Sequence, residues 1–270
     1  MRDTKEKKNL PIGVFDSGVG GLSVLRELQK ILPNENFVFL ADQKYVPYGE
    51  KTKGQLVKLT RKIAAYLHKN YKIKMLVVAC NTATCYTIPE LRAKFSFPIV
   101  GTVPTIKPAA EMSKSKVIAV ISTLSTAKSK MLKDLIKENA TGVKVINISC
   151  QHLENAVENS DLTGEKVEKL LRKYLEPIKK SKADYIVLGC THYPFLKESI
   201  YKVMARPINL LDSGEAIAKR TKAVLHESSL QNENKAKGKS IYLTTGKAQK
   251  FSTVASTLLA RKISTKAVKI

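Results

Sequence analysis

Residues 12–22 read Ile-Gly-Val-Phe-Asp-Ser-Gly-Val-Gly-Gly-Leu, an apolar run followed by two polar residues and a glycine-rich turn. From Leu22 to Ile31, leucine and isoleucine then recur at the spacing of a helix face, and Pro33 follows. The segment therefore predicts a buried strand, a tight turn and an amphipathic helix. Repeated along a chain, this unit is typical of a parallel α/β sheet.

The same alternation of short apolar runs and amphipathic stretches continues through most of the chain. Eight further strands are predicted at residues 37–41, 75–79, 99–103, 117–122, 143–148, 185–189, 208–211 and 241–244. Helices are predicted around residues 56–67, 127–139, 165–180, 195–204 and 215–225, with one more after residue 80. Most of the strands are apolar on both faces, which indicates a mostly parallel α/β fold with helices on both sides of the sheet.

The chain has 270 residues, of which 43% are hydrophobic and 26% are charged. These fractions are typical of globular proteins and exclude a disordered or fibrous chain. The length suits one large or two small domains. The apolar runs are too short to cross a membrane, and residues 1–9 lack the apolar core of an export signal. We therefore expect a soluble, cytoplasmic protein without a membrane partner.

Lysine and arginine number 47 against 23 acidic residues, which gives a net charge of +24. The basic residues are spread along the whole chain. In residues 166–180, for example, lysines occupy the polar face of a helix whose apolar stripe runs from Val167 to Ile178. Aromatic residues make up only 6%, and no nucleic-acid-binding motif is found. We interpret the charge as a solvated surface and do not expect binding to nucleic acid.

Small polar groups and two thiols come directly after the predicted strands. Such positions are residues 16–18, 80–82, 123–126 and 190–192, with 47–49 a few residues beyond another strand. In an open parallel sheet the ligand lies beyond the carboxyl ends of the strands. The sequence therefore predicts a polar pocket at this edge, with Cys80 and Cys190 among its residues.

The glycine-rich turn at residues 16–21 leaves two interpretations open. Its backbone N–H groups and the helix that follows could hold an anion such as a carboxylate. It does not match the dinucleotide pattern, because Ser23 stands at the third glycine position, and it lacks the Gly-Lys-Ser/Thr of a phosphate loop. The alternative is a purely structural strand-to-helix turn.

The four cysteines show neither a Cys-x-x-Cys pair nor the spacing of a zinc site, and we expect no metal. Cys80 and Cys190 occupy matching contexts 110 residues apart, Val-Val-Ala-Cys-Asn-Thr and Val-Leu-Gly-Cys-Thr-His. We expect each to begin a helix or turn whose N–H groups lower the thiol pKa. Each would anchor one of two similar α/β lobes that face each other across a cleft. Cys85 and Cys150 are interpreted as structural.

Two facing thiols suit proton transfer at a tetrahedral carbon. One thiolate removes the proton, the other thiol delivers one from the opposite face, and the centre is inverted. His192 is a candidate acid/base partner of Cys190, two residues away. The alternative is a turn histidine bonded to the backbone.

With these residues in view, the chain resembles the glutamate racemases of the cofactor-independent aspartate/glutamate racemase superfamily. The resemblance runs from about residue 12 to residue 259. It rests on residues 13–22, on Pro-Tyr-Gly at 47–49, on Val-Ala-Cys-Asn-Thr-Ala at 78–83, on Pro-Ile-Val-Gly at 98–101 and on Leu-Gly-Cys-Thr-His-Tyr-Pro at 188–194. Jointly, in this order and spacing, these motifs are highly specific.

The resemblance implies two pseudo-symmetric, Rossmann-like lobes with mostly parallel sheets and the active site in the cleft between them. Residues 10–102 plus 210–263 would form the first lobe, and residues 103–209 the second. It implies racemisation of L- and D-glutamate without a cofactor, which supplies D-glutamate for peptidoglycan. By analogy, Cys80 removes the α-proton of D-glutamate and Cys190 that of L-glutamate. The expected partner is this small substrate, and a homodimer is kept as a hypothesis.

The resemblance also implies roles for the residues around the thiols. Asp16, Glu158 and His192 match polar groups that assist them. Substrate binding is expected from Asp16, Ser17, Tyr48, Gly49, Asn81, Thr82, Thr123, Thr126, Thr191 and His192.

Three segments depart from the family pattern. The usual Ala-Arg before Pro-Tyr-Gly is Lys44-Tyr45, Ser122 replaces the usual Gly, and residues 150–154 read Cys-Gln-His-Leu-Glu in place of Cys-Pro-Leu-Phe-Val.

Other functions remain alternatives at this stage. A sister enzyme acting on aspartate or another small acid would use the same two thiols. A two-lobed binding protein without catalysis would not need both. A secondary role at the DNA machinery, as reported for some glutamate racemases, would show salt-dependent DNA or gyrase binding, and we do not expect it.

Overall fold

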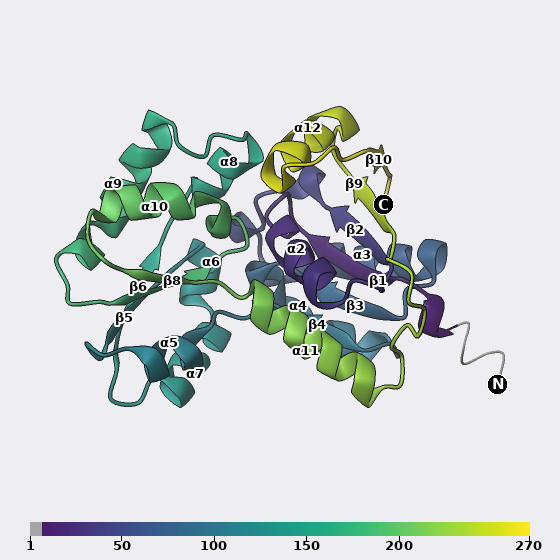
Figure 1. Ribbon diagram of the computed structural model, residues 1–270, viewed down its shortest axis with the longest axis horizontal. Coiled ribbons are helices and arrows are strands. Elements are labelled where there is room, and N and C mark those ends of the chain that lie inside the picture. Colours follow the sequence, from purple (N-terminus) through teal and green to yellow (C-terminus); the bar gives the residue numbers. More distant parts are fainter. Residues whose placement is uncertain (1–6) are drawn as a thin grey trace.

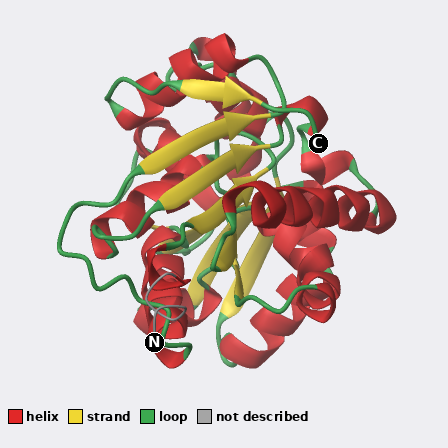
Figure 2. Ribbon diagram, turned by 90° about the vertical axis from the view of Figure 1, so that its right-hand side faces the viewer, coloured by secondary structure: helices red, strands yellow, loops and turns green. Residues whose placement is uncertain are grey.

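The computed structural model describes residues 7–270 and consists of two parallel sheets, each flanked by helices. We call the part built on the six-stranded sheet the first lobe and the part built on the four-stranded sheet the second lobe. In Figure 1 the second lobe, with β5 to β8, lies on the left and the first lobe on the right. Figure 2 shows helices on both faces of the strands. The predicted α/β fold with mostly parallel sheets is confirmed, and the described strands pair only in parallel.

The first lobe has the strand order β10-β9-β2-β1-β3-β4. Its central strand β1 pairs in parallel with β2 and with β3, for example Phe15 with Leu40 and with Val78. The strands are β1 (Ile12–Asp16), β2 (Phe37–Ala41), β3 (Met75–Val78), β4 (Ile99–Gly101), β9 (Ser240–Thr244) and β10 (Thr265–Ala267). Every residue of β1, β2 and β3 is buried, as expected for strands with helices on both faces.

The second lobe has the strand order β6-β5-β7-β8, again with parallel pairing only among its described strands. The strands are β5 (Val117–Ser122), β6 (Lys144–Ser149), β7 (Tyr185–Gly189) and β8 (Asn209–Leu211). The order second-first-third-fourth therefore occurs in both lobes, as β2-β1-β3-β4 and as β6-β5-β7-β8. Cys80 follows β3 and Cys190 follows β7, so the two thiols occupy equivalent places in the two lobes.

Amphipathic helices complete the layers, and local capping sets several of their ends. α3 starts with a capping box between Thr52 and Gln55. α9 packs the predicted apolar stripe from Val167 to Ile178 into the core. The helices are α2 (Leu22–Ile31), α3 (Lys53–Tyr71), α4 (Asn81–Lys94), α5 (Ile106–Met112), α6 (Leu124–Lys128), α7 (Lys130–Asn139), α8 (Leu153–Glu158), α9 (Glu165–Lys179), α10 (Lys197–Met204), α11 (Gly214–Glu227) and α12 (Ala248–Leu259). No helix among residues 7–270 combines the length and the apolar character needed to span a bilayer.

Several predicted boundaries were wrong, for identifiable physical reasons. The helix predicted at 127–139 is two helices, because Ser129 has extended backbone and its Oγ accepts a hydrogen bond from Leu132 N as the cap of α7. β10, α5 and α8 were not predicted, because they have only three, seven and six residues and are too short for a clear period. The predicted lobe limits stay a prediction.

Candidate active site

The carboxyl ends of strands from both lobes border one cavity. Its lining includes residues that directly follow β1, β5 and β7, and Cys80 two residues beyond β3. The lining residues are Ser17, Val46, Pro47, Tyr48, Gly49, Cys80, Asn81, Thr82, Thr123, Glu154, Cys190, Thr191 and His192. The cavity measures about 20 Å³, which is room for about one water molecule.

Cys80 is buried at the start of α4, where it forms the N-cap. Its Sγ accepts a hydrogen bond from Ala83 N at 3.5 Å and lies 3.8 Å from Ser17 Oγ. Burial, and then the negative charge of Asp16, raise the pKa of Cys80 well above its usual value. The expected lowering by the helix N-terminus is therefore wrong for Cys80, because burial and Asp16 outweigh the Ala83 N–H.

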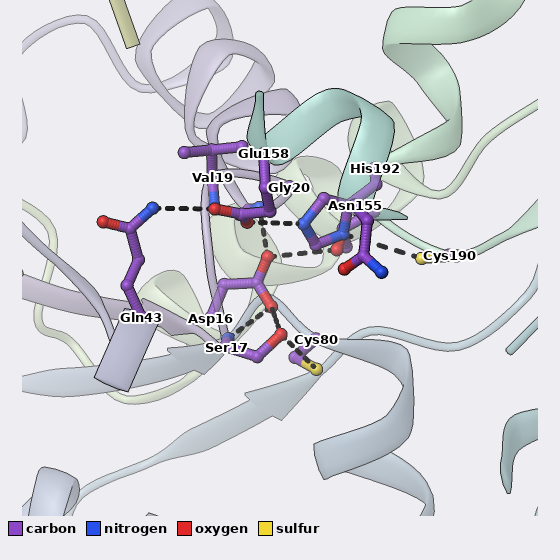
Figure 3. A network of polar contacts seen from close by, with 12 residues as sticks. Asp16, Ser17, Val19, Gly20, Gln43, Cys80, Asn155, Glu158, Cys190 and His192 are labelled. Atoms are coloured by element: carbon purple, nitrogen blue, oxygen red, sulfur yellow. Dashed lines mark hydrogen bonds and ion pairs between the residues drawn. The ribbon is translucent and has the colours of Figure 1, made fainter. Parts of the chain in front are cut away.

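Cys190 is buried at the end of β7, and a cationic partner accompanies it (Figure 3). Its Sγ lies 3.7 Å from His192 Nδ1, while His192 Nε2 lies 2.8 Å from Glu158 Oε1. Burial by itself lowers the pKa of His192, but the hydrogen bonds and charges of Cys190 and Glu158 outweigh it and raise the pKa well above 6.5. The pKa of Glu158 is lowered, since His192 and other donors outweigh its burial. The pair is charged at neutral pH.

The two thiols differ in how their surroundings treat negative charge. Burial raises the pKa of Cys190 too, and Glu154 adds to this, but His192 acts in the opposite direction. For Cys80 the nearest charge is the carboxylate of Asp16, which disfavours a thiolate. Burial therefore favours the thiol form of both groups, and the Cys190 thiolate has the better stabilisation.

Asp16 lies behind the cavity wall and organises the first lobe's edge. Its Oδ1 accepts from Ser17 N at 2.6 Å and from Ser17 Oγ at 3.1 Å. Its Oδ2 accepts from Gly21 N and, across the lobes, from Thr191 Oγ1 at 3.1 Å. Burial is the main cause that raises the pKa of Asp16. A carboxyl held in this way can exchange a proton with Cys80 through the Ser17 hydroxyl.

The glycine-rich turn binds a carboxylate, which belongs to the side chain of Glu158. Val19 N donates to Glu158 Oε1 at 2.6 Å. A Cβ at Gly18 would lie 1.8 Å from that oxygen, and a Cβ at Gly20 would lie 2.4 Å from His192 Nδ1. The missing side chains let Glu158 and His192 of the second lobe approach the turn of the first.

Three threonine hydroxyls form a cluster between the lobes. Thr82 Oγ1 lies 2.9 Å from Thr123 Oγ1 and 3.2 Å from Thr126 Oγ1. Thr123 Oγ1 and Thr126 Oγ1 lie 3.1 Å apart. Thr123 Oγ1 also accepts from Thr126 N at 3.3 Å, as the cap of α6. A hydroxyl proton can rotate toward a carboxylate when a ligand replaces the contacts between the three hydroxyls.

The cavity wall also includes Tyr48, Gly49 and Asn81. Each has a polar group that is hydrogen-bonded to another residue of the protein. Tyr48 is buried, and its hydroxyl donates to Asp42 Oδ2 at 2.6 Å. Gly49 O accepts from Ser125 Oγ at 2.6 Å across the lobes, and Asn81 Nδ2 donates to Thr102 O at 3.2 Å. These bonds fix the shape of the wall around the thiols.

The structure brings the predicted residues together in two layers. Ten of them line the cavity: Ser17, Tyr48, Gly49, Cys80, Asn81, Thr82, Thr123, Cys190, Thr191 and His192. Asp16, Glu158 and Thr126 lie outside that lining and contact it through hydrogen bonds. Cys85, half-buried on α4, and Cys150, buried in the core, lie outside the lining.

Two residues near the site were missed. Gln43 Nε2 donates to Glu158 Oε2 at 2.7 Å and so links the lobes. Its position just beyond β2, at the same sheet edge, could have indicated it. Glu154, on α8, lines the cavity. No local pattern pointed to it, because the segment 150–154 departs from the family motif.

Larger cavities lie elsewhere. One of about 250 Å³ lies beside α3 and is lined by Lys58, Leu59 and Lys62, among others. Two others lie at the amino end of the first sheet near Pro33 and Glu35. They measure about 470 and 380 Å³. Neither contains a thiol, and the residues that precede β2 lie at the edge opposite to Cys80. Among residues 7–270 no group of three or more His, Cys, Asp or Glu side chains is arranged for a metal ion.

Comparison with known proteins gives a consistent result. Residues 12–221 match the Asp/Glu/Hydantoin racemase family. The glutamate racemase of Deinococcus radiodurans is 42% identical over 245 residues, which cover 90% of this chain and 84% of the relative.

Two solved structures are similar over nearly the whole chain. One is the glutamate racemase isoform RacE1 from Bacillus anthracis, with a TM-score of 0.86, 32% identity and coverage of 97% and 98% of the two chains. The other is the Escherichia coli glutamate racemase in complex with L-glutamate and the activator UDP-MurNAc-ala, with a TM-score of 0.83, 33% identity and coverage of 96% and 97%. This chain therefore belongs to the Asp/Glu/hydantoin racemase family, and within it to the glutamate racemases.

Proposed function

We propose that this protein interconverts L- and D-glutamate, with Cys80 and Cys190 as the two acid/base groups. The observation that carries the proposal is the pair of buried thiols at equivalent places in two lobes, both bordering one closed cavity. Because each thiol comes from a different lobe, a substrate held between them presents opposite faces of its α-carbon to the two sulfurs. That arrangement inverts a stereocentre.

In the direction from L- to D-glutamate, the Cys190 thiolate takes the α-proton and becomes a thiol. The Cys80 thiol gives its proton to the opposite face of the same carbon and becomes a thiolate. The reverse reaction exchanges the two roles. Before the next turnover, one proton returns from Cys190 to Cys80 by exchange with solvent or neighbouring groups, so atoms and charges balance.

Each thiol has a partner that can serve this exchange. The imidazolium of His192 stabilises the Cys190 thiolate, and Glu158 keeps that ring charged and oriented. On the other side, Ser17 connects Cys80 to Asp16, whose raised pKa makes it a proton acceptor of useful strength. The site thus contains a relay behind each sulfur.

Carboxylate binding supports the choice of an acidic amino acid. The hydroxyls of Thr82 and Thr123 and the amide of Asn81 offer donors on the cavity wall. The Escherichia coli relative has been solved with L-glutamate, and we transfer this substrate to the present chain on the strength of 33% identity over 96% of it. Fixed donors around the substrate's carboxylates lower the energy of the carbanion-like transition state.

The cavity of about 20 Å³ is far smaller than glutamate. We propose that residues 10–102 plus 210–263 and residues 103–209 move as two units that open to admit substrate and close to exclude water. Glu158 crosses this interface to Val19 and Gln43, which favours the closed state. A homodimer remains a hypothesis. From the family we infer that the D-glutamate serves peptidoglycan synthesis in the cytoplasm.

The test is an assay of the purified protein with L-glutamate, D-glutamate, L-aspartate and D-aspartate, with no cofactor added. We expect both glutamate enantiomers to be converted. In deuterated water the label should enter chiefly the α-position of the product enantiomer, because the incoming proton comes from an exchangeable thiol. Conversion of aspartate in preference to glutamate would assign the site to the smaller acid. No conversion of either would contradict the proposal.

A further inference from the structure

Glu154 is the cavity residue that the mechanism leaves without a task. It lies on α8, one turn before Glu158, so both carboxylates extend from the same face of this helix. Glu158 reaches the glycine turn and His192, whereas Glu154 borders the cavity between the thiols. The negative charge of Glu154 also contributes to the raised pKa of Cys190, and both residues line the cavity.

The carboxylate of Glu154 is buried and incompletely bonded. The residue is 7% exposed, and its Oε2 has no hydrogen-bond partner among the residues that the structure describes. A buried polar atom without a partner is costly, and in native proteins it calls for a ligand or another specific explanation. Here the atom belongs to a residue on the wall of a substrate cavity.

The neighbouring carboxylates have no such free capacity. Both oxygens of Asp16 accept hydrogen bonds from Ser17, Gly21 and Thr191. Both oxygens of Glu158 are likewise occupied, by Val19 and His192 on one and by Gln43 on the other.

Glutamate brings two carboxylates and one ammonium group into the cavity. The wall offers hydroxyl and amide donors for the carboxylates, at Thr82, Thr123 and Asn81. The ammonium group carries three N–H donors and a positive charge, and it needs an acceptor. A carboxylate with an open oxygen is the strongest acceptor for a cation that proteins offer.

We propose that Glu154 binds the α-ammonium group of the substrate and so selects amino acids over dicarboxylic acids without an amino group. The inference rests on the proposed glutamate substrate. It adds a specificity determinant in the second lobe, next to Cys190.

The test compares two ligands that differ only in the amino group, L-glutamate and glutarate, in the wild type and in Glu154→Gln. Gln has nearly the same shape but no charge. We expect the KM for L-glutamate to rise about 10- to 100-fold, with kcat changed much less. The Ki of glutarate as a competitive inhibitor should stay within about twofold or improve, because a buried negative charge has been removed. Glu165→Gln, an exposed residue of α9, is the matched control and should change neither value.

If Glu154 had only a structural role, Glu154→Gln would weaken the binding of both ligands. If the residue were irrelevant, the substitution would weaken the binding of neither. Either result overturns the inference. If Glu154→Gln does not fold, Glu154→Val, the residue of the family pattern at this position, is measured in the same way. Calorimetric measurement of the binding of both ligands distinguishes a failure of the proposed racemase function from a failure of the proposed role of Glu154. A wild type that binds glutamate but does not racemise it contradicts the proposed function, while equal losses of both ligands contradict the role of Glu154.

Discussion

Each lobe places a cysteine just beyond its third strand, β3 or β7, in the same strand order. The charged groups near the two cysteines have opposite sign. The residue two positions after Cys80 is Thr82, and the residue two positions after Cys190 is His192. The strand next to the cysteine also differs. The sheet register continues from Phe15–Val78 to place Asp16 beside Ala79, one residue before Cys80, whereas Ser122 of β5 pairs with Gly189, one residue before Cys190. The first thiol thus lies near an acid and the second lies near a cation.

This difference shows which properties a repeated fold supplies and which the side chains supply. Parallel strands in the same order place both sulfurs at one interface. The backbone alone does not decide which sulfur ionises more readily, because burial raises the pKa of both. Asp16 and His192 decide it. Variants of the thiols and of their charged neighbours test this asymmetry.

The largest effect is expected from removing either thiol. Cys80→Ala and Cys190→Ala should each lower racemisation by about 10³-fold or more, because each removes one of the two proton-transferring groups. The measurement is the rate of change in optical rotation from both enantiomers, with circular dichroism to show that the fold is intact. Cys85→Ala, on the same helix as Cys80 but outside the cavity lining, should keep normal activity. Wild-type rates in either single variant would refute the two-base scheme.

Glu158→Gln should destabilise the closed protein by about 3–5 kcal/mol near neutral pH, because it leaves His192 buried without its charged partner. The pH dependence follows from the signs of the shifts. The lowered pKa of Glu158 gives stability that is lost as the pH falls through it. The raised pKa of His192 gives stability that is lost as the pH rises through it.

The difference in unfolding free energy between wild type and Glu158→Gln should therefore be largest between these two pKa values and shrink on both sides. Denaturant unfolding across this pH range measures it. A difference that does not vary with pH would show that the pair is not ionised. Glu165→Gln serves as the exposed control.

His192→Thr gives Cys190 the neighbour that Cys80 already has. We expect kcat/KM to fall about 10²-fold. It must fall equally in both directions, because the enantiomers have equal free energy. The asymmetry instead appears in isotope effects. With α-deuterated L-glutamate the effect should increase, since proton transfer to Cys190 becomes the slow step, and with α-deuterated D-glutamate it should decrease.

Equal isotope effects from both enantiomers of this variant would show that His192 does not act on Cys190 in particular. The control is His68→Thr, an exposed histidine on α3, for which unchanged kinetics are expected.

Gly20→Ala should cost about 1–3 kcal/mol of stability and reduce activity, because the added methyl group meets the ring of His192 and the Thr191 hydroxyl at under 3 Å. Gly54→Ala offers a matched comparison in α3, where a Cβ meets nothing within 4 Å. There we expect a gain of up to about 1 kcal/mol from helix propensity. The stability of both variants is measured by thermal unfolding, and their activity by a racemase assay. Equal effects at the two positions would contradict the docking of His192 on the turn.

Much of this site could be predicted from sequence because its chemistry lies directly beyond strands. The strands 37–41, 117–122 and 185–189 were predicted to the residue, since continuous apolar runs bounded by polar residues mark buried strands. Cys80 and Cys190 could be identified as candidate site residues because each directly follows one of the predicted strands. Gln43 and Glu154 were not identified, because neither forms a local pattern with its neighbours. They matter only through contacts with residues more than 30 positions away.

The sequence by itself determined the α/β alternation, the two matching cysteine contexts and the polar residues beside them, because local periodicity and strand ends are encoded by near neighbours. Only the tertiary structure decided that the glycine turn of the first lobe would receive Glu158 of the second, and that Cys80 would lie near an acid while Cys190 lies near a cation. These facts depend on burial and on charges brought together from distant segments. Electrostatic energies follow distance in space, which the order of residues along a chain does not specify.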